Sequence, residues 1–312
     1  VQMLEAVAKA LSESGHLLVE AGTGTGKSMA YLIPSVEWAA RNGERVLVST
    51  NTINLQDQLI HKDFPDLNRA LGSDYRAAVL KGRRNYLCPR RLSAASRLGP
   101  RNPEEARVFA KVLVWLNAGG TGDVSEINLR GPAEAAIWSR MSSDYEECSL
   151  EACLEHTGGT CPYYKARLAA ESAHVVIVNH ALLLADIGTG NRVIPDYQYL
   201  IVDEGHQLEA ATTRGLAFEV AESDLHRIIQ DLEGGGQRFS PAFAEASLPP
   251  ERRAELRSLV AASAEKAREA ARLIGPFFQR LLDFMERRRD GQPLSRYGQQ
   301  ERILPSTRSL PF

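Results

Sequence analysis

The sequence has few cysteines, no long apolar run and no segment typical of an exported protein. Its four cysteines in 312 residues are too few for a disulfide scaffold. No run of about 18 apolar residues occurs, which argues against a membrane span. The first residues, VQMLEAVAKAL, lack the apolar core and cleavage site of a signal peptide. We therefore expect a cytoplasmic protein with no membrane partner, whose cysteines serve a metal or cluster site.

Acidic residues are missing from one window, Tyr75 to Pro103, although the net charge of the whole chain is only −2. The same window contains Arg76, Lys81, Arg83, Arg84, Arg90, Arg91, Arg97 and Arg101. A local basic patch on a nearly neutral chain indicates a surface that binds a polyanion. The alternative is a solvated helix face that is merely rich in arginine.

Short apolar runs alternate with helical patterns at the start of the chain and again after residue 173. We expect strands at residues 16–21, 45–50, 174–180 and 199–206, and helices at 1–12, 28–41 and 54–64. This order is typical of a parallel sheet covered by helices, as in an α/β fold.

The alternation stops between residues 81 and 161, a stretch with helical fragments and all four cysteines. After residue 209 the apolar residues follow the spacing of a helix bundle. We therefore expect an α/β domain built from residues 1–80 and 162–212, a mostly helical insertion at 81–161, and a helical domain at 213–312.

The stretch AGTGTGKS fits the pattern of a phosphate-binding loop, with Ala21 where the strict pattern has glycine. Its glycines allow the backbone to turn tightly and point N–H groups at phosphate oxygens. Lys27 is expected to reach the β- and γ-phosphates, and Ser28 to offer its hydroxyl to Mg²⁺. The residues predicted to bind nucleotide are Ala21, Gly22, Thr23, Gly24, Thr25, Gly26, Lys27 and Ser28.

An acidic motif, YLIVDEGH, ends a later apolar run and supplies the expected partner of this loop. Asp203 is predicted to hold Mg²⁺, and Glu204 to orient and deprotonate the attacking water. His206 would sense the γ-phosphate, although a lone histidine is often an ordinary polar residue. Together with Lys27, these three residues are the predicted catalytic set.

The cysteines are spaced as one distant residue followed by C-x₄-C-x₇-C, namely Cys88, Cys148, Cys153 and Cys161. Four thiolates from loops suit either a tetrahedral zinc site or a four-iron cluster. The absence of paired C-x₂-C segments favours a cluster slightly, but spacing alone does not decide between them.

These motifs, taken in order, resemble the XPD/DinG family of superfamily 2 iron-sulfur helicases, and most of all its bacterial DinG-like branch. The resemblance rests on EAGTGTGKS, VLVSTNTINLQDQL, KGRRNYLC, the later cysteines, VIVNHALLLAD and VDEGH, and it covers residues 1 to about 212. It implies a RecA-like motor domain of the P-loop NTPase class, a [4Fe–4S] insertion held by the four cysteines, and part of a helical arch.

The resemblance also implies ATP-driven, 5′ to 3′ unwinding of DNA at a junction of single strand and duplex, by what we expect to be a monomer. It places Ser49, Thr50, Thr52, Arg83 and Arg84 among the DNA-contacting residues. The acidic motif departs from the family by reading DEGH instead of DEAH. We also expect the family's adenine-contacting glutamine and its second motor domain to lie outside this chain, which would leave the fragment almost without hydrolysis.

Two other functions agree with the same residues. One is a redox-sensing DNA-binding module that uses ATP as a structural ligand, and the other is a phosphate-loop ATPase with structural zinc and no role on DNA. A nuclease is also conceivable, but no additional acidic metal cluster stands out in the sequence.

Overall fold

The computed structural model describes residues 1–22, 24–143, 148, 150–216, 220–233 and 249–289 of the chain. The chain divides into two compact units, 1–217 and 218–312. The residue Thr23 of the predicted loop lies outside the described residues. No helix in the described part is both long enough and apolar enough to cross a membrane.

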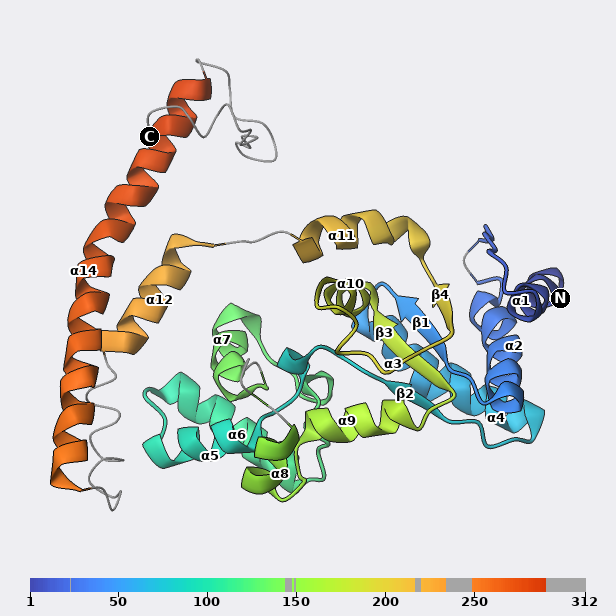
Figure 1. Cartoon of the computed structure of the whole chain (residues 1–312), viewed down its shortest axis with the longest axis horizontal. Helices are drawn as coiled ribbons and strands as arrows, with labels where there is room; N and C mark the ends of the chain where they lie inside the picture. The colour runs from blue at the N-terminus through green and yellow to red at the C-terminus, as the bar shows by residue number, and fades with distance from the viewer. Residues whose placement is uncertain (23, 144–147, 149, 217–219, 234–248, 290–312) are drawn as a thin grey trace. The chain divides into compact units, whose positions relative to one another are not determined.

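A four-stranded parallel sheet organises the first unit, with the strand order β2-β3-β1-β4 (Figure 1). The strands are β1 (Val46–Thr50), β2 (Ala77–Val79), β3 (Val175–Asn179) and β4 (Tyr199–Val202). Each strand pairs in parallel with its neighbours, so β1 lies between β3 and β4 although the segments are far apart in sequence. The predicted α/β fold with a parallel sheet is confirmed.

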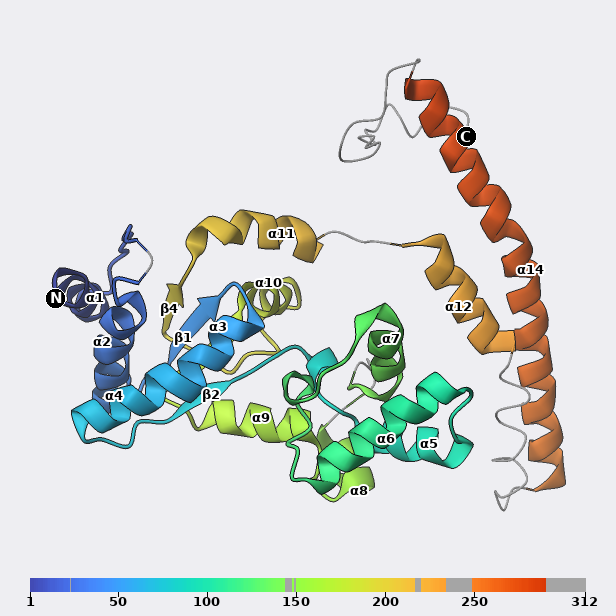
Figure 2. The same ribbon diagram turned by 180° about the vertical axis from the view of Figure 1, so that it is seen from behind.

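Helices precede and follow the strands in the first unit. Those of the α/β part are α1 (Gln2–Ser12), α2 (Lys27–Asn42), α3 (Ile53–Gln58), a π-helical turn (Leu59–Asp63), α4 (Phe64–Leu71), α9 (Pro162–Glu171), α10 (His180–Gly188), a 3₁₀ turn (Gly205–Gln207) and α11 (Leu208–Leu216). Seen from behind, α3 lies in front of the sheet (Figure 2). Thr52 and Asn179 cap α3 and α10 by accepting from the backbone N–H groups of Leu55 and Leu182.

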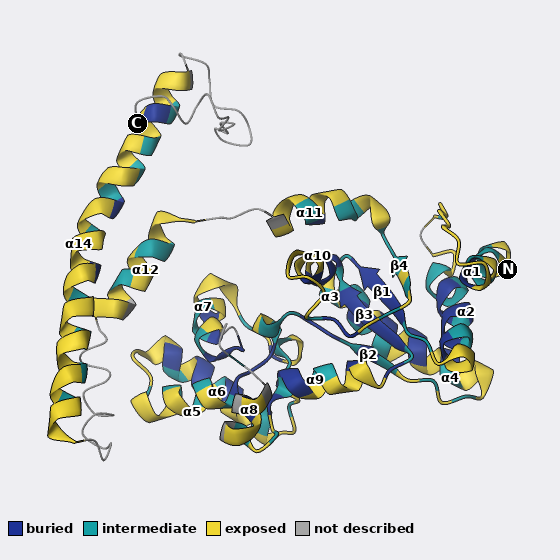
Figure 3. Cartoon of the chain, viewed as in Figure 1, coloured by how far each residue is buried: buried dark blue, intermediate teal, exposed yellow. Residues whose placement is uncertain are grey.

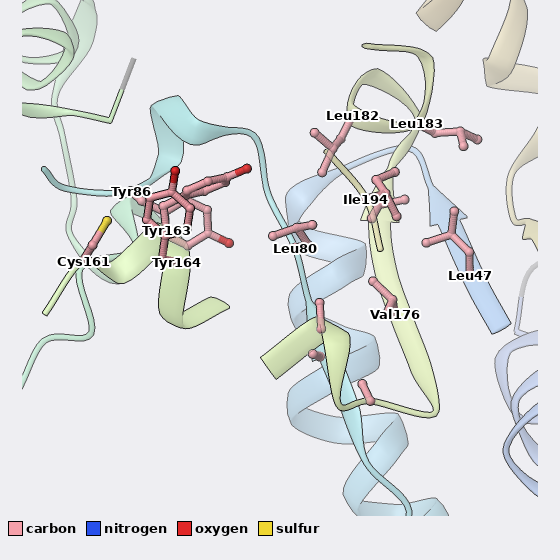
Figure 4. Close-up of a cluster of buried hydrophobic side chains, with 14 of the residues drawn as sticks. Leu47, Leu80, Tyr86, Cys161, Tyr163, Tyr164, Val176, Leu182, Leu183 and Ile194 are labelled. Carbon is pink, nitrogen blue, oxygen red and sulfur yellow. The ribbon is translucent and has the colours of Figure 1, made fainter. Parts of the chain in front are cut away.

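The central strands are buried on both faces, which is why they read as continuous apolar runs (Figure 3). Val46 and Val48 belong to an apolar cluster on one face that also contains residues of α1, α2 and α4. Leu47 packs on the other face with Val176, α9 and α10, and Figure 4 shows part of this second cluster. The alternation of faces along β1 follows the two-residue period of a strand.

The expected strand at residues 16–21 is wrong, since no strand is assigned there. Leu17, Leu18 and Val19 are 44%, 98% and 40% exposed, so this apolar run is not covered by a neighbouring strand or helix. A short apolar run indicates burial, but only pairing with a partner strand makes it part of a sheet.

Residues 81–161 contain helices and no strand of the sheet in their described part. The elements are a 3₁₀ turn (Arg83–Asn85), α5 (Pro89–Leu98), α6 (Pro103–Asn117), a second 3₁₀ turn (Val124–Glu126), α7 (Gly131–Met141) and α8 (Leu150–Thr157). This region has its own apolar core, which includes Val108, Phe109 and Trp138. We retain 81–161 as the proposed boundaries of the insertion.

Lys81 joins this insertion to the α/β part through a buried group of charges. Its side chain is only 3% exposed, and its Nζ lies 3.2 Å from Asp57 Oδ1 on α3 and 2.8 Å from Asp123 Oδ2 in the insertion. The ammonium also donates to Ser125 Oγ at 2.9 Å, so its three donors have three acceptors.

In the second unit, α12 (Glu222–Glu233) packs against α14 (Pro250–Arg289), a 40-residue helix. Ala267, Ile274 and Phe284 are buried along α14, and the first two are seven residues apart, the spacing of one helix face. The assignment of residues 213–312 to an arch stays a prediction.

Replacing Lys81 with methionine is expected to lower the free energy of unfolding of the first unit by about 3–5 kcal/mol, because two carboxylates lose their buried partner. Urea unfolding followed by tryptophan fluorescence measures this, since Trp38, Trp115 and Trp138 all lie in the first unit. Lys62→Met removes an exposed charge and should change stability by no more than about 0.5 kcal/mol. Equal unfolding midpoints for the two variants would refute the role given to Lys81.

His174 makes the stability of the first unit depend on pH. Its Nδ1 accepts the backbone N–H of Arg76 at 3.0 Å, and burial, followed by the charge of Arg76, lowers its pKa. Between its lowered pKa in the folded chain and its ordinary pKa, His174 is therefore protonated in the unfolded chain but neutral in the folded chain. The contribution of His174 to stability is complete above the unfolded pKa of about 6.5 and is lost as pH falls below it.

Urea unfolding between about pH 5 and pH 7.5, a range that spans the unfolded histidine pKa, tests this expectation. His174→Asn keeps an acceptor and should flatten the loss of stability below about pH 6.5, whereas His16→Asn, an exposed histidine, should not. The same slope in the wild type and in His174→Asn would rule out this contribution.

Candidate nucleotide site and cysteine group

The parallel sheet brings the predicted functional segments to one edge. Ser49 of β1 lies in register with Val178 of β3 and with Val202 of β4. The backbone N–H of Asp203 donates to Ser49 O at 2.8 Å, which continues the pairing one residue beyond β4. The acidic motif therefore begins where three neighbouring strands end, the usual place for ligands in open α/β sheets.

The phosphate-binding loop leads directly into α2. Gly24 and Gly26 have φ angles of 74° and 79°, in the left-handed region that favours glycine. Thr25 Oγ1 donates to Gly22 O at 2.9 Å, and Lys27 Nζ donates to Ala21 O at 3.3 Å. A loop folded in this way ends at the N-terminus of a 16-residue helix, where the helix dipole favours an anion.

Lys27 and Glu204 connect the loop with the acidic motif. Lys27 Nζ lies 3.6 Å from Glu204 Oε1, and both side chains are about three-quarters buried. Glu204 has φ 56° and ψ 41°, a left-handed conformation that costs about 1–3 kcal/mol for a residue with a Cβ. His206 Nδ1 lies 3.4 Å from Glu204 Oε2, while its own side chain is 66% exposed. The carboxylate thus lies between the loop lysine and this histidine.

Both carboxylate oxygens of Asp203 are hydrogen-bonded. Tyr31 donates its hydroxyl to Asp203 Oδ2 at 3.1 Å, and the backbone N–H of Glu204 donates to Oδ1 at 3.0 Å. Burial, together with the charge of Asp203, raises the pKa of Tyr31 far above its ordinary value, so the hydroxyl stays protonated. Ser28 and Asp203 offer oxygen atoms of the kind that Mg²⁺ prefers. Sequence reasoning missed Tyr31, whose only signal was its position one turn after Lys27.

Ser49 and Thr50 are fully buried, so neither side chain offers an exposed atom to DNA in this structure. Ser49 Oγ lies 2.8 Å from His180 Nδ1, another fully buried group that the sequence did not single out. Burial lowers the pKa of His180, and the backbone groups of Glu204 and Asp203 act in the opposite direction. The DNA-contact role of Ser49 and Thr50 stays a prediction.

The exposed member of the predicted DNA-contacting trio is Thr52, the N-cap residue of α3. Four buried polar atoms, Thr50 Oγ1, both amide atoms of Gln56 and His180 Nε2, have no hydrogen-bond partner within the described part of the chain. These atoms therefore keep unused hydrogen-bonding capacity.

The four cysteines are free thiols, one before α5, two at α8 and one before α9. Cys88 and Cys161 precede α5 and α9, and Cys148 Sγ lies 3.0 Å from Cys153 Sγ. Burial and the neighbouring thiols Cys148, Cys161 and Cys88 raise the pKa of Cys153 to about 12. Thiols that interact in this way match the donor chemistry of zinc or an iron-sulfur cluster. No group of three or more potential ligands among the described residues forms an assembled metal site, however.

Of the two adjacent arginines, Arg83 contacts the cysteine segment. Its Nη1 donates to Cys148 O at 3.1 Å, and its guanidinium carbon lies 4.7 Å from the centre of the Tyr163 ring. Tyr164 donates to the same carbonyl at 3.2 Å, and Tyr163 and Tyr164 lie together with Cys161 in Figure 4. Arg84 is exposed, and its carbonyl accepts the indole N–H of Trp138.

A basic cavity of about 510 Å³ lies on the insertion near the cysteines. It is lined by Pro89, Arg90, Ser93, Ala94, Arg97, Thr157 and Thr160. Two arginines at a concave surface agree with the polyanion surface that the sequence predicted for this window.

Two family models match the chain. The DEAD/DEAH box helicase model matches residues 3–88 and the DEAD_2 model matches residues 140–225, together more than half of the chain.

The curated relatives are longer proteins. The chain is 34% identical over 275 residues to the ATP-dependent helicase DinG of Mycobacterium tuberculosis (strain ATCC 25177 / H37Ra), covering 78% of this chain and 41% of that protein. It is 30% identical over 302 residues to the 3'-5' exonuclease DinG of Bacillus subtilis (strain 168), covering 95% of this chain and 31% of that protein. The chain thus spans less than half the length of these relatives.

A solved structure, Truncated XPD, is similar with a TM-score of 0.42 and 14% identity, over 86% of this chain and 76% of that one.

The two family models and the identity to the relatives establish the family. The chain belongs to the XPD/DinG family of DEAD/DEAH-box helicases.

Proposed function

We propose that this chain is the nucleotide-binding and DNA-engaging part of an ATP-dependent DNA helicase that unwinds duplex DNA 5′ to 3′. The observation that carries the proposal is the 3.6 Å approach of Lys27 Nζ to Glu204 Oε1, which joins the phosphate-binding loop to the acidic motif. Membership of a helicase family supports it, and the direction of movement is carried over from that family.

The loop and Lys27 would bind the phosphates of ATP. Gly24 and Gly26 have the left-handed backbone angles of a tight turn, so that N–H groups at the start of α2 would face a bound anion. Lys27 would exchange its pairing with Glu204 for the β- and γ-phosphates. Glu204, released from the lysine, would then accept a proton from the attacking water, and His206 would report on the γ-phosphate.

Ser28 and Asp203 would hold Mg²⁺. The bound ion would neutralise charge on the β- and γ-phosphates. The chain's own contribution is a carboxylate fixed in place by Tyr31 and by the backbone of Glu204.

The DNA surface would run from Thr52, at the N-terminus of α3, to the basic window of the insertion. Arg84, Arg90 and Arg97 supply positive charge there, and arginine side chains bind phosphates well because of their planar donors. Arg83 would act indirectly, by holding the segment that carries Cys148. A single strand leaving a duplex junction is the partner that we propose.

Cys88, Cys148, Cys153 and Cys161 would hold the [4Fe–4S] cluster. These cysteines lie in three segments of the insertion, at the starts of α5 and α9 and at α8, so that a bound cluster would join these segments into one rigid body suited to separating DNA strands. The contact between Cys148 and Cys153 and the influence of Cys88 and Cys161 on Cys153 support this ligand set.

The proposed function is tested by measuring how one variant, Lys27→Ala, binds ATP and how it binds single-stranded DNA. Lys27→Ala is expected to weaken binding of a fluorescent ATP analogue in Mg²⁺ about 10- to 100-fold, because hydrogen bonds to charged phosphates are lost. Its affinity for a labelled single-stranded oligonucleotide, read by fluorescence anisotropy, should stay within about twofold of the wild type, a difference below about 0.5 kcal/mol.

The matched control is Lys9→Ala, which removes an exposed lysine of α1 and should change neither affinity. A wild-type chain that binds the ATP analogue but no DNA would contradict the helicase assignment. It would favour an ATPase with a structural metal and no role on DNA.

Metal analysis tests the cluster. Anaerobically purified chain is expected to contain about four irons with matching acid-labile sulfide, and Cys88→Ser should lose most of both, because one of four thiolate ligands is gone. Ser96→Ala, on the same helix α5 but exposed, should keep the iron. About one zinc per chain without iron would refute the cluster and indicate a zinc site instead.

A further inference from the structure

Tyr31 is a buried polar residue at the nucleotide site that no motif of the sequence includes. It lies in α2 one turn after the phosphate-binding loop, and it is only 2% exposed. Its ring packs in the apolar cluster beneath the sheet, with Leu32 and Val36 of the same helix. The hydroxyl, by contrast, is hydrogen-bonded: it donates to Asp203 Oδ2 at 3.1 Å. Because Asp203 directly follows β4, this hydrogen bond links α2 to the end of β4.

The Tyr31 side chain is linked to both residues proposed to hold Mg²⁺. Its hydroxyl donates a hydrogen bond to Asp203, and Ser28, three residues earlier on the same face of α2, acts on the pKa of Tyr31 in the lowering direction. One buried hydroxyl therefore connects the loop helix with the acidic motif.

The hydrogen bonds to Asp203 leave part of its carboxylate free for a cation. An ionised carboxylate has about four lone-pair sites on its two oxygens. Tyr31 occupies one site on Oδ2, and the backbone N–H of Glu204 occupies one on Oδ1. With one donor on each oxygen, the carboxylate is fixed in orientation, and each oxygen keeps a site for another ligand.

We propose that Tyr31 is a positioning residue for Mg²⁺, which orients the Asp203 carboxylate toward the ion through its hydroxyl. The inference rests on the proposed function, since it concerns the metal that accompanies ATP. Groups that orient metal ligands typically contribute 10- to 100-fold to metal affinity or activity. Tyr31 thus acts through Asp203 and does not itself touch the nucleotide.

Binding of a fluorescent ATP analogue to the 312-residue chain, measured across a Mg²⁺ titration, tests this role. Tyr31→Phe keeps the packed ring and removes only the hydroxyl. We expect the Mg²⁺ concentration at half-maximal effect to rise about tenfold or more. Affinity in EDTA should remain within about twofold of the wild type, a difference of about 0.4 kcal/mol or less.

Ser35→Ala is the matched control. Ser35 is a buried hydroxyl one turn further along α2, and it donates to the backbone carbonyl of Tyr31 at 2.6 Å. Its removal perturbs the same helix without touching Asp203, so the Mg²⁺ dependence should not move.

A double-mutant cycle with Asp203→Asn identifies the route of the effect. If Tyr31 acts through Asp203, Tyr31→Phe should cause no further shift in the Asp203→Asn background. A Mg²⁺ curve for Tyr31→Phe that matches the wild type overturns the inference, and so does an equal loss of affinity with and without Mg²⁺. Failure of the wild type to bind the analogue overturns the proposed function as well, which separates the two results.

Discussion

Parallel pairing of β1 with both β3 and β4 is the constraint on which the rest of the first unit depends. The register places Ser49 opposite Val178 and Val202, so three strands from distant parts of the sequence end at the same level. His180 and Asp203, each the residue after its strand, are therefore brought to one edge without any local sequence relation. Apolar packing on both faces holds the register, because a shift of one residue would turn every side chain of the shifted strand to the opposite face of the sheet.

The candidate nucleotide site could be proposed from the sequence because its signals are local. The glycines of the loop and the acidic end of β4 follow from chain conformation over a few residues, and Gly24 and Gly26 have the backbone angles that the pattern requires. Tyr31 and His180 could not be found in this way, since their partners Asp203 and Ser49 lie 172 and 131 residues away. For the same reason the sequence did not distinguish the buried Ser49 from the exposed Thr52.

The insertion shows a different limit of sequence reasoning. Arg83 and Arg84 are the same residue type at adjacent positions, so the sequence does not tell them apart. Arg83 turns inward because its guanidinium packs on Tyr163 and donates to the carbonyl of Cys148. The strand predicted at residues 16–21 was wrong for a related reason. Local hydrophobicity suggested a strand, but a strand exists only where a neighbouring backbone is free to pair with it.

The ion pairs of Lys81 make the cysteine-bearing insertion part of the packing of the α/β domain. Asp57 belongs to the helix that Thr52 caps, whereas Asp123 belongs to the insertion, and one buried ammonium neutralises both. A chain from which residues 82–161 were deleted would keep Asp57 and Lys81 but lose Asp123 and Ser125, and the Lys81 ammonium would lose two of its three acceptors. Gain or loss of the insertion during evolution therefore requires coordinated changes on both sides of the junction.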